Sequence, residues 1–519
     1  MFGGNLRILI RENAWEAFYP KKKELENKKQ ETKDMNTKTK KIKAGAFAVA
    51  MLFLAMAAAT TIKADPPFVP SGVIGRSQQQ VHPVPPTPPS YQVIWDAEYP
   101  DGLIPMDSVA DRNNDVIIGG ISQMGSGLVV KYSGPTGDVI WSNDVTDEVN
   151  ALWTPEHEDQ NPYHADLHTI RNLMIDMNNQ RFGFDTSDLQ IFVGGVDVDS
   201  NNDVVVVATA TDVSQDDLPQ DVIVAKYNSE DGALIWDKFI TFYTYDFSMG
   251  ITVDKNDNVI VAGASGGVEL REGHLIPLME GWMYKLAGSD GHMLHTDHIF
   301  GIAQPLPYYF DVDSDSQNNY FATGPALIID WSDFPHNLNM TQTSILNKYN
   351  AALHLVNTQL WPVDPYTFIL TVCVDSSDYV YVGGWIITNG WSREYIVKFN
   401  NNIDTVLWTI PNEYYFEKGT IMKLANISNV KIVAAAQLTD YDGYMTTEIF
   451  RASNGRHYFR INEGKDFIQD TYAMTVAVDR ANDITTSAMK FPPETGDWYT
   501  MKYHVRDGSP QMEMQIDII

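Results

Sequence analysis

The hydrophobic positions of this chain form short runs that recur in a fixed order. An apolar segment that ends in Val-Asp or a variant of it is followed by a short polar turn and a second apolar segment, as in VADRNNDVIIGG (109–120), VDSNNDVVVVAT (198–209) and VDKNDNVIVAGA (253–264). Later copies occupy 312–324, 374–384, 424–436 and 478–489. Short β-branched runs bounded by Gly, Asn and Asp favour strands. The pattern therefore predicts one β-hairpin that is repeated seven times.

A second hairpin follows each of these first hairpins. Its first strand ends in a cationic residue and a large apolar one, at Lys131-Tyr132, Lys226-Tyr227, Lys285-Leu286, Lys348-Tyr349, Lys398-Phe399 and Lys502-Tyr503, with Arg451 out of register in the sixth copy. A turn containing Gly or Asn leads to the last strand, which carries an equivalent Trp at 141, 236 and 408. Two hairpins per repeat predict a blade of four antiparallel strands.

The spacing of the repeats predicts how the blades are arranged. An Asp ends the first strand at 111, 199, 254, 313, 375 and 479, and Asn426 takes this place in the sixth copy. Only the first interval is unusually long, because an insertion at 146–191 interrupts it. A single sheet with two apolar faces is not stable alone, whereas blades packed around an axis bury both faces. We therefore expect an all-β fold, a seven-bladed β-propeller that extends over 91–519.

An extra copy of the fourth strand precedes the first full repeat. This segment, VIWDAEY, runs from Val93 to Tyr99, and we expect it to close the ring by pairing with the last blade. The C-terminal QMEMQIDII is a weaker outer strand for the same blade. An incomplete eighth blade is the alternative.

The first 64 residues have the layout of an export signal. Lysines at 38, 40, 41 and 43 precede an uncharged apolar stretch from Ala44 to Ile62, and Ala64 offers a cleavage position. The same stretch is long enough to span a bilayer if it stays uncut, so an N-terminal anchor is the alternative. Met35 is a second candidate start. The prolines of 65–90 predict an extended linker to the propeller.

The charge of the exported part excludes one class of partner. The chain has 37 Lys or Arg and 67 Asp or Glu; 13 and 6 of these lie in the first 64 residues, so the rest carries a formal charge of −37. Such a field repels phosphate backbones, and we expect no nucleic acid as a partner and membrane contact only through the N-terminal segment. Cys373 is the only cysteine, which rules out an intramolecular disulfide. It lies in an apolar run and is interpreted as a buried structural residue.

These repeats resemble a β-propeller repeat family of exported bacterial and archaeal proteins. That family has a VD-x-x-N-V-Y-V-x-G hairpin followed by a V-x-K-Y-n-x-x-G-x-x-x-W hairpin, and the resemblance covers 93–519. It implies a secreted or cell-surface propeller whose repeated residues build the blades and belong to no active site. The segments TGDVIW and DGALIW also resemble the Trp-docking motif of quinoprotein dehydrogenases, which are propellers too. Those enzymes usually have eight such blades, and several fourth strands here lack the Trp.

The links on one face of the ring vary in length, which marks it as the expected binding face. They are the segments 146–191, 211–221, 265–281, 326–343, 387–394 and 438–446. Aromatic rings beside carboxylates or amides in or next to these links suit sugars, peptides or cationic groups. The candidate ligand-binding residues are Asp330, Trp331, Asp333, Trp385, Trp391, Asp440, Tyr441 and Asp442. The alternative is that these rings only fill space under the loops.

Two patterns suggest a metal, each with a simpler explanation. The insertion contains His157, and it places His164 and His168 at helical i, i+4 spacing. Ala165 stands where the H-E-x-x-H motif has Glu, so a zinc-protease site is excluded, and a surface segment is the simpler hypothesis. Turns such as Asp111/Asn113/Asp115 alternate oxygen ligands as calcium loops do, but lack their Gly and distal Glu. We expect no cofactor, with calcium as the alternative.

The sequence favours binding over catalysis. No phosphate loop, dinucleotide fingerprint or nucleophile elbow occurs in a suitable context. We therefore expect an extracytoplasmic binding or scaffolding propeller that recognises a surface glycan or protein. A quinone- or metal-dependent enzyme outside the cytoplasm is the alternative.

Overall fold

The structure is a computed structural model, and it describes most of the chain from residue 89 to residue 506. The described ranges are 89–123, 125–146, 189–212, 220–240, 245–271, 274–300, 305–330, 339–362, 366–388, 391–411, 419–428, 431–438, 445–463, 470–491 and 498–506. The expected export signal, the linker and most of the insertion lie outside these ranges. Within them, no helix is both long and apolar enough to cross a membrane.

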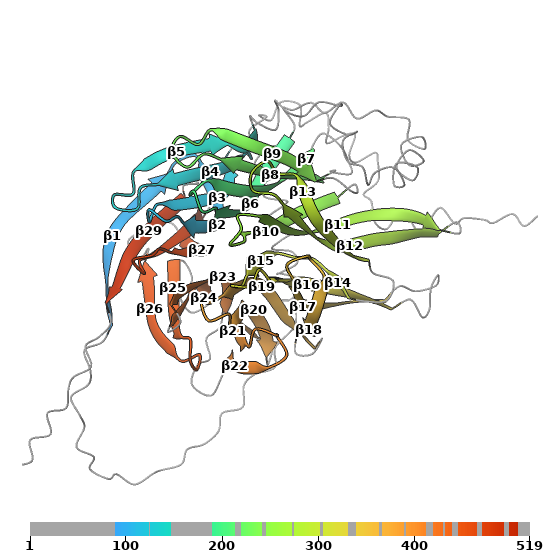
Figure 1. Ribbon diagram of the computed structural model, residues 1–519. Helices are drawn as coiled ribbons and strands as arrows, with labels where there is room; N and C mark the ends of the chain where they lie inside the picture. The colour runs from blue at the N-terminus through green and yellow to red at the C-terminus, as the bar shows by residue number, and fades with distance from the viewer. Residues whose placement is uncertain are drawn as a thin grey trace, which may run out of the picture.

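The described strands form seven antiparallel blades around one axis (Figure 1). From the axis outward, blade 1 contains β2 (Gly102–Ala110), β3 (Val116–Ser122), β4 (Gly127–Tyr132) and β5 (Val139–Asp144). Blade 2 contains β6 (Leu189–Val198), β7 (Val204–Asp212), β8 (Gln220–Tyr227) and β9 (Leu234–Ile240). Blade 3 contains β10 (Tyr245–Val253), β11 (Val259–Arg271), β12 (His274–Leu286) and β13 (Met293–Phe300).

Blade 4 has a divided inner strand. It contains β14 (Leu306–Pro307) and β15 (Asp311–Ser314), then β16 (Tyr320–Asp330), β17 (Asn339–Tyr349) and β18 (Leu355–Leu360). Blade 5 contains β19 (Thr367–Val374), β20 (Val380–Thr388), β21 (Trp391–Phe399) and β22 (Val406–Ile410). Blade 6 contains β23 (Gly419–Ser428), β24 (Lys431–Leu438), β25 (Met445–Arg451) and β26 (His457–Glu463).

The N-terminal strand completes blade 7, so the prediction of a seven-bladed ring is confirmed. This blade contains β27 (Asp470–Val478), β28 (Ile484–Phe491) and β29 (Trp498–Arg506), and β1 (Ser90–Tyr99) pairs antiparallel with β29. The indole of Trp95 donates a hydrogen bond of 2.8 Å to the Gly134 carbonyl of blade 1. The ring is therefore closed by chain segments from its two ends. The tail QMEMQIDII lies outside the described residues.

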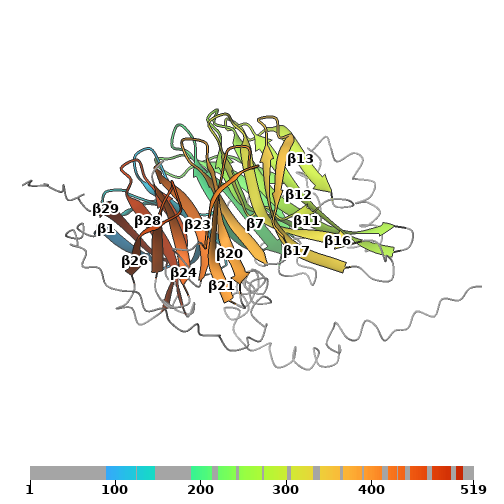
Figure 2. The same cartoon turned by 90° about the horizontal axis from the view of Figure 1, so that it is seen from below.

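The direction of the strands defines two faces of the ring. Figure 2 shows the blades in a second view. The inner strand of each blade runs toward the tight turn that follows it, and the third strand runs the same way. We call the face with these turns the short-turn face, and the opposite one the long-loop face. Because Ser90 pairs with Arg506 at the end of β29, the described chain begins and ends at the short-turn face.

In five blades the recurrent Asp organises the short turn and pairs with the recurrent Lys. In blade 2, Oδ1 of Asp199 accepts hydrogen bonds from the N–H groups of Asn201 and Asp203, and its Oδ2 lies 2.6 Å from Nζ of Lys226. Equivalent buried pairs are Asp111–Lys131, Asp254–Lys285, Asp375–Lys398 and Asp479–Lys502. Both members of each pair are almost completely buried. The repeat motif is therefore part of the architecture of the blade.

Two repeats differ from the alignment predicted from the sequence. In blade 4 the turn residue is Asp315, whose N–H donates to the Asn319 carbonyl as Asp199 N–H donates to that of Asp203, so the assignment of Asp313 was wrong by two residues. In blade 6 the strand register places Ile427 and Ile449 where the other blades have Asp and Lys, so Asn426 was also misassigned. Both Ile side chains belong to one apolar cluster. An apolar pair thus replaces the ion pair in this blade.

Candidate functional site

The inner strands carry a β-bulge at the same level in six blades. The ladder shifts by one residue there and leaves a bulge residue without a cross-strand partner: Met106, Gly194, Met249, Leu370, Met422 and Met474. In blade 4 the break between β14 and β15 falls at this level. A bulge bends its strand and redirects the side chains beside it. The residues that line the axis are therefore set by seven similar distortions of the backbone.

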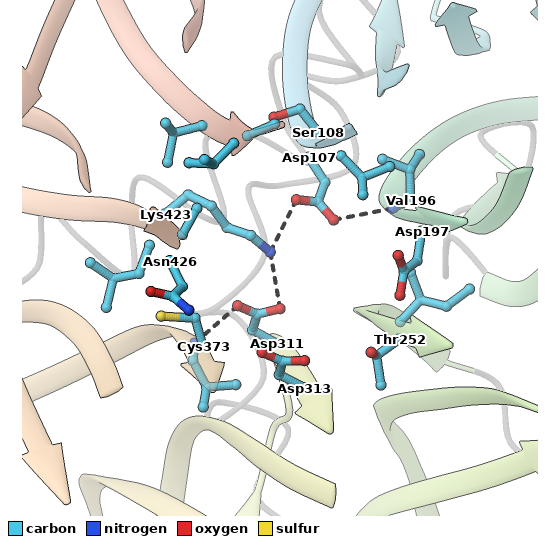
Figure 3. A pocket seen from close by; sticks show the side chains of 18 of the residues that line it. Asp107, Ser108, Val196, Asp197, Thr252, Asp311, Asp313, Cys373, Lys423 and Asn426 are labelled. Atoms are coloured by element: carbon cyan, nitrogen blue, oxygen red, sulfur yellow. Dashed lines mark hydrogen bonds and ion pairs between the residues drawn. The ribbon is translucent and has the colours of Figure 1, made fainter. Parts of the chain in front are cut away.

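The residue after each bulge belongs to a ring around the axis, which we call the axial ring. Its members are Asp107, Gly195, Gly250, Asp311, Thr371, Lys423 and Thr475. Lys423 reaches across this ring, because its Nζ lies 3.0 Å from Oδ1 of Asp107 and 3.0 Å from Oδ1 of Asp311 (Figure 3). Blades 1, 4 and 6 are thus joined at the centre of the molecule by one cation and two carboxylates.

The two carboxylates also bind the backbone of the following blade. Oδ2 of Asp107 accepts a hydrogen bond of 3.1 Å from the Val196 N–H. Oδ2 of Asp311 accepts one of 2.9 Å from the Val372 N–H and one of 2.8 Å from the Thr371 hydroxyl. Burial raises the pKa of Asp107, although Lys423 opposes this shift. Burial would lower the pKa of Lys423, but the two neighbouring carboxylates outweigh it and raise that pKa.

A cavity of about 220 Å³ lies on the axis between the axial ring and the short turns. All seven inner strands line it, and Asp197 and Asp313 add two carboxylates to those of the axial ring (Figure 3). Burial raises the pKa of Asp313 to about 7, although hydrogen bonds from the Ser314 and Val374 N–H groups act to lower it. Burial raises the pKa of Asp197 to about 6, against hydrogen bonds from the Val253 and Val198 N–H groups. Protons therefore bind here in the neutral range.

Cys373 also lines the cavity, but its thiol is in its unreactive form. The side chain is 6% exposed, and burial raises the pKa of the thiol well above its ordinary value, with nearby Asp313 and Asp311 adding to the shift. A nucleophilic cysteine needs the opposite environment, one that stabilises the thiolate. The interpretation of Cys373 as a buried structural residue is therefore supported.

The cavity is acidic and well satisfied, and this limits its chemistry. Four carboxylates face one lysine, and each carboxylate accepts at least one hydrogen bond or contacts Lys423. Within the described part of the chain, no group of three or more His, Cys, Asp or Glu side chains is arranged to hold a metal ion. The residues of the cavity hold neighbouring blades together, and a small cationic group has the charge that fits the cavity.

The structure separates the candidate ligand-binding residues predicted from the sequence. Asp330 ends β16 and Trp391 begins β21, both at the long-loop face. Trp385 lies in β20 with 3% of its surface exposed, and its ring stacks on Phe368 with centroids 5.4 Å apart. This is the arrangement of a packing residue. The remaining candidates, Trp331, Asp333, Asp440, Tyr441, Asp442, His157, His164 and His168, lie outside the described residues.

The predicted long loops contain more strand than the sequence suggested. β11 and β12 stay paired as far as Arg271 and His274, so the segment 265–281 is a hairpin that projects from the ring (Figure 1). β16 and β17 stay paired as far as Asp330 and Asn339 in the same way. The long-loop face is therefore formed by hairpins of unequal length in addition to loops.

The turns of the short-turn face are joined to one another. The N–H after the turn Asp donates to a side chain in the turn of the next blade, from Ser200 to Asp257 and from Ser316 to Asp378. Arg112 donates to Asn202 in the same way, and Arg480 of blade 7 donates to Asn114 of blade 1. Groups in the short turns thus link neighbouring blades at four junctions, whereas the blades differ most at the long-loop face.

The comparisons with known proteins find no family and only remote structural similarity. No protein-family model matches the chain, and no curated protein matches it. Among solved structures, BamB from Moraxella catarrhalis is 11% identical, covers 80% of this chain and all of its own, and has a TM-score of 0.38. A quinohemoprotein alcohol dehydrogenase from Pseudomonas putida is 8% identical over 81% of this chain and 78% of its own, with a TM-score of 0.39.

An ulvan lyase, which represents a family of polysaccharide lyases, gives similar values. It is 7% identical, the match covers 79% of this chain and 95% of the lyase, and the TM-score is 0.41. These neighbours have different functions, and similarity at this level carries no information about a shared site. The chain is a seven-bladed β-propeller on the basis of its own strand order.

Proposed function

We propose that this chain is an extracytoplasmic binding or scaffolding propeller of the exported repeat type, which recognises a surface glycan or protein through its long-loop face. The contrast between the two faces carries the proposal. The turns of the short-turn face are used for links between blades. The long-loop face presents hairpins and links of unequal length, and such variation on a rigid scaffold is typical of binding surfaces.

The side on which the described chain enters the ring agrees with a binding surface on the long-loop face. Ser90 lies at the short-turn face, so the N-terminal signal or anchor segment joins the ring on that side. A propeller that is held there by a Pro-rich linker presents its long-loop face away from the attachment point. The formal charge of −37 outside the first 64 residues disfavours anionic partners and favours neutral glycans or basic protein surfaces.

A substitution at the long-loop face tests the proposal. If Trp391 contacts the ligand, Trp391→Ala should weaken binding to a glycan array about thirtyfold, since an essential aromatic contact contributes about 2 kcal/mol or more. The melting temperature should change little if the ring serves binding and not packing. Asp330→Asn at the end of β16 tests the acidic component of the same face.

The matched control is a tryptophan that belongs to the blade core. Trp236 is 8% exposed and donates a hydrogen bond of 3.0 Å to the Gly288 carbonyl of the next blade. Trp236→Ala should lower the free energy of unfolding by about 3–5 kcal/mol through the cavity that it leaves. If Trp391→Ala unfolds as readily as Trp236→Ala, or binds every ligand as wild type does, the long-loop face loses its assigned role.

A further inference from the structure

Three methionines meet beside the axis on the long-loop side of the axial ring. Met422, Met474 and Met106 are the bulge residues of blades 6, 7 and 1, which are consecutive in the closed ring. The inner strands β23, β27 and β2 that carry them lie next to one another. The three residues therefore lie at one level of the ring, one residue before the axial ring.

The same three side chains belong to one contact cluster. Met474 is 6% exposed and forms a buried cluster with Ile104 and Met489, and the partly exposed Met106 and Met422 pack against this cluster together with Leu103 and Tyr472. Nε2 of Gln437 donates to Sδ of Met474 at 3.3 Å, which fixes the orientation of that thioether. A thioether sulfur keeps a second lone pair for another partner. Three neutral thioethers thus belong to or pack against one cluster, and two of them are on partly exposed side chains.

The position of this cluster favours a cation. Asp107 follows Met106 directly, and Lys423 follows Met422 directly. Asp107, Asp311 and Lys423 form one ion-paired group with two carboxylates and one ammonium, so its formal charge is negative. Thioether ligands prefer soft metal ions, and Cu(I) is the soft ion that they select.

We propose that Met106, Met422 and Met474 form a thioether site for a soft monovalent cation, Cu(I), for which Ag(I) is a substitute without redox chemistry. The site lies beside the axis and is separate from the hairpins of the long-loop face, so it does not depend on the proposed binding function. Thioethers do not titrate in the neutral range, so no proton has to leave when the ion binds.

The test is a titration of the full exported chain with Ag(I), and with Cu(I) under anaerobic conditions. Wild type should bind one ion, and X-ray absorption of the Cu(I) complex should show sulfur neighbours. Met422→Leu and Met474→Leu conserve volume, so both should fold, because such exchanges usually cost less than about 1.5 kcal/mol. Each should weaken binding at least tenfold and abolish the rise in melting temperature that Ag(I) gives wild type.

Two controls separate this site from other methionines. Met249→Leu changes the bulge residue of blade 3, which is outside the cluster, and should leave Ag(I) affinity unchanged. Met512→Leu with Met514→Leu removes the thioethers of the C-terminal tail and should also leave it unchanged. If wild type binds no stoichiometric Ag(I), or if Met422→Leu and Met474→Leu bind as wild type does, the three methionines are packing residues and the proposal is overturned.

Discussion

A buried Asp and Lys join the turn, the third strand and the next blade in five of the repeats. Nζ of Lys226 contacts Asp199 at 2.6 Å and donates to the Gly288 carbonyl of blade 3 at 2.9 Å. Asp199 in turn accepts two backbone N–H groups of its own turn. Each charge is therefore compensated, as burial requires. In blade 6, Ile427 and Ile449 stand in place of the Asp and the Lys and pack in one apolar cluster. The fold therefore tolerates an apolar pair at these two positions.

Removing one member of such a pair should be costly. Lys226→Met leaves the Asp199 carboxylate buried without its cation, and breaking a buried pair in this way costs about 3–5 kcal/mol. We expect a loss of this size in the free energy of unfolding measured with urea. Ile449→Val in blade 6 is the control and should cost only about 1 kcal/mol. Equal losses for the two variants would mean that the ion pair has no special role.

The raised pKa values of two cavity carboxylates predict that these groups stabilise the fold more at acidic pH than at neutral pH. An unfolded Asp titrates near pH 3.9, whereas burial raises the pKa of Asp197 to about 6 and that of Asp313 to about 7. The folded protein thus binds these protons more tightly, so their contribution to the free energy of unfolding falls as pH rises from about 4 to about 7. Asp313→Asn should make the pH dependence of the melting temperature flatter in this range. An unchanged slope would contradict the raised pKa of Asp313.

At the level of elements, a glycine and a tryptophan join neighbouring blades at four of the seven junctions. Gly137, Gly232, Gly291 and Gly455 all have positive φ and lie against the Trp of the preceding blade: Trp95, Trp141, Trp236 and Trp408. Each indole donates to a carbonyl in the same turn. The Gly-x-x-x-Trp pattern of the sequence is therefore a docking device between blades. No ligand is needed to explain it.

A pair of glycine variants can separate the two requirements of this turn. Gly232 has φ of +71°, and a β-carbon there would lie 2.9 Å from the Trp141 ring. Gly125 has φ of +79°, but its nearest atoms belong to the Gln190 side chain at 3.6 Å. Gly125→Ala should cost about 1–2 kcal/mol from backbone strain alone, and Gly232→Ala should cost clearly more. If thermal unfolding shows equal losses of stability for the two variants, the Trp141 indole moves aside without cost.

The sequence predicted the elements better than their exact alignment. Seven hairpin pairs and closure by the N-terminal strand followed from apolar periodicity and spacing, because each blade repeats the same short-range pattern. The register of blade 4 was wrong because two Asp residues, Asp313 and Asp315, compete for one turn position. Trp385 was assigned to a ligand surface because the sequence shows only that an aromatic residue is present. It does not show that Phe368 stacks on the Trp385 ring.

The axial cavity could not be predicted from periodicity. A bulge adds one residue to a strand without changing its apolar pattern, so Asp107, Asp311 and Lys423 looked like unrelated positions of separate repeats. They face one another because their strands share the axis and the same bulge. The only signal in the sequence is their constant distance of four residues before the turn position, at 111, 315 and 427, and it appears only after the alignment is corrected.

The whole molecule is a closed ring. Hydrogen bonds link neighbouring turns on its short-turn face, and the hairpins of its long-loop face differ in length. β1 joins the two ends of the described chain in blade 7, and hydrogen bonds from Trp95 and Arg480 continue the contacts between blades into blade 1. Such closure makes the ring a rigid support, and rigid supports suit recognition by attached loops and hairpins. The proposed role is therefore binding, with no chemical step assigned to the chain.

The most direct test of this role is to follow the fate of a ligand that the protein binds. The purified chain without its first 64 residues would be applied to a glycan array, and the bound glycan would then be incubated with excess protein and analysed by mass spectrometry. We expect saturable binding, weakened about thirtyfold by Trp391→Ala, and recovery of the glycan intact. Release of shortened or oxidised glycan by the wild-type protein would contradict it and would identify the propeller as an enzyme.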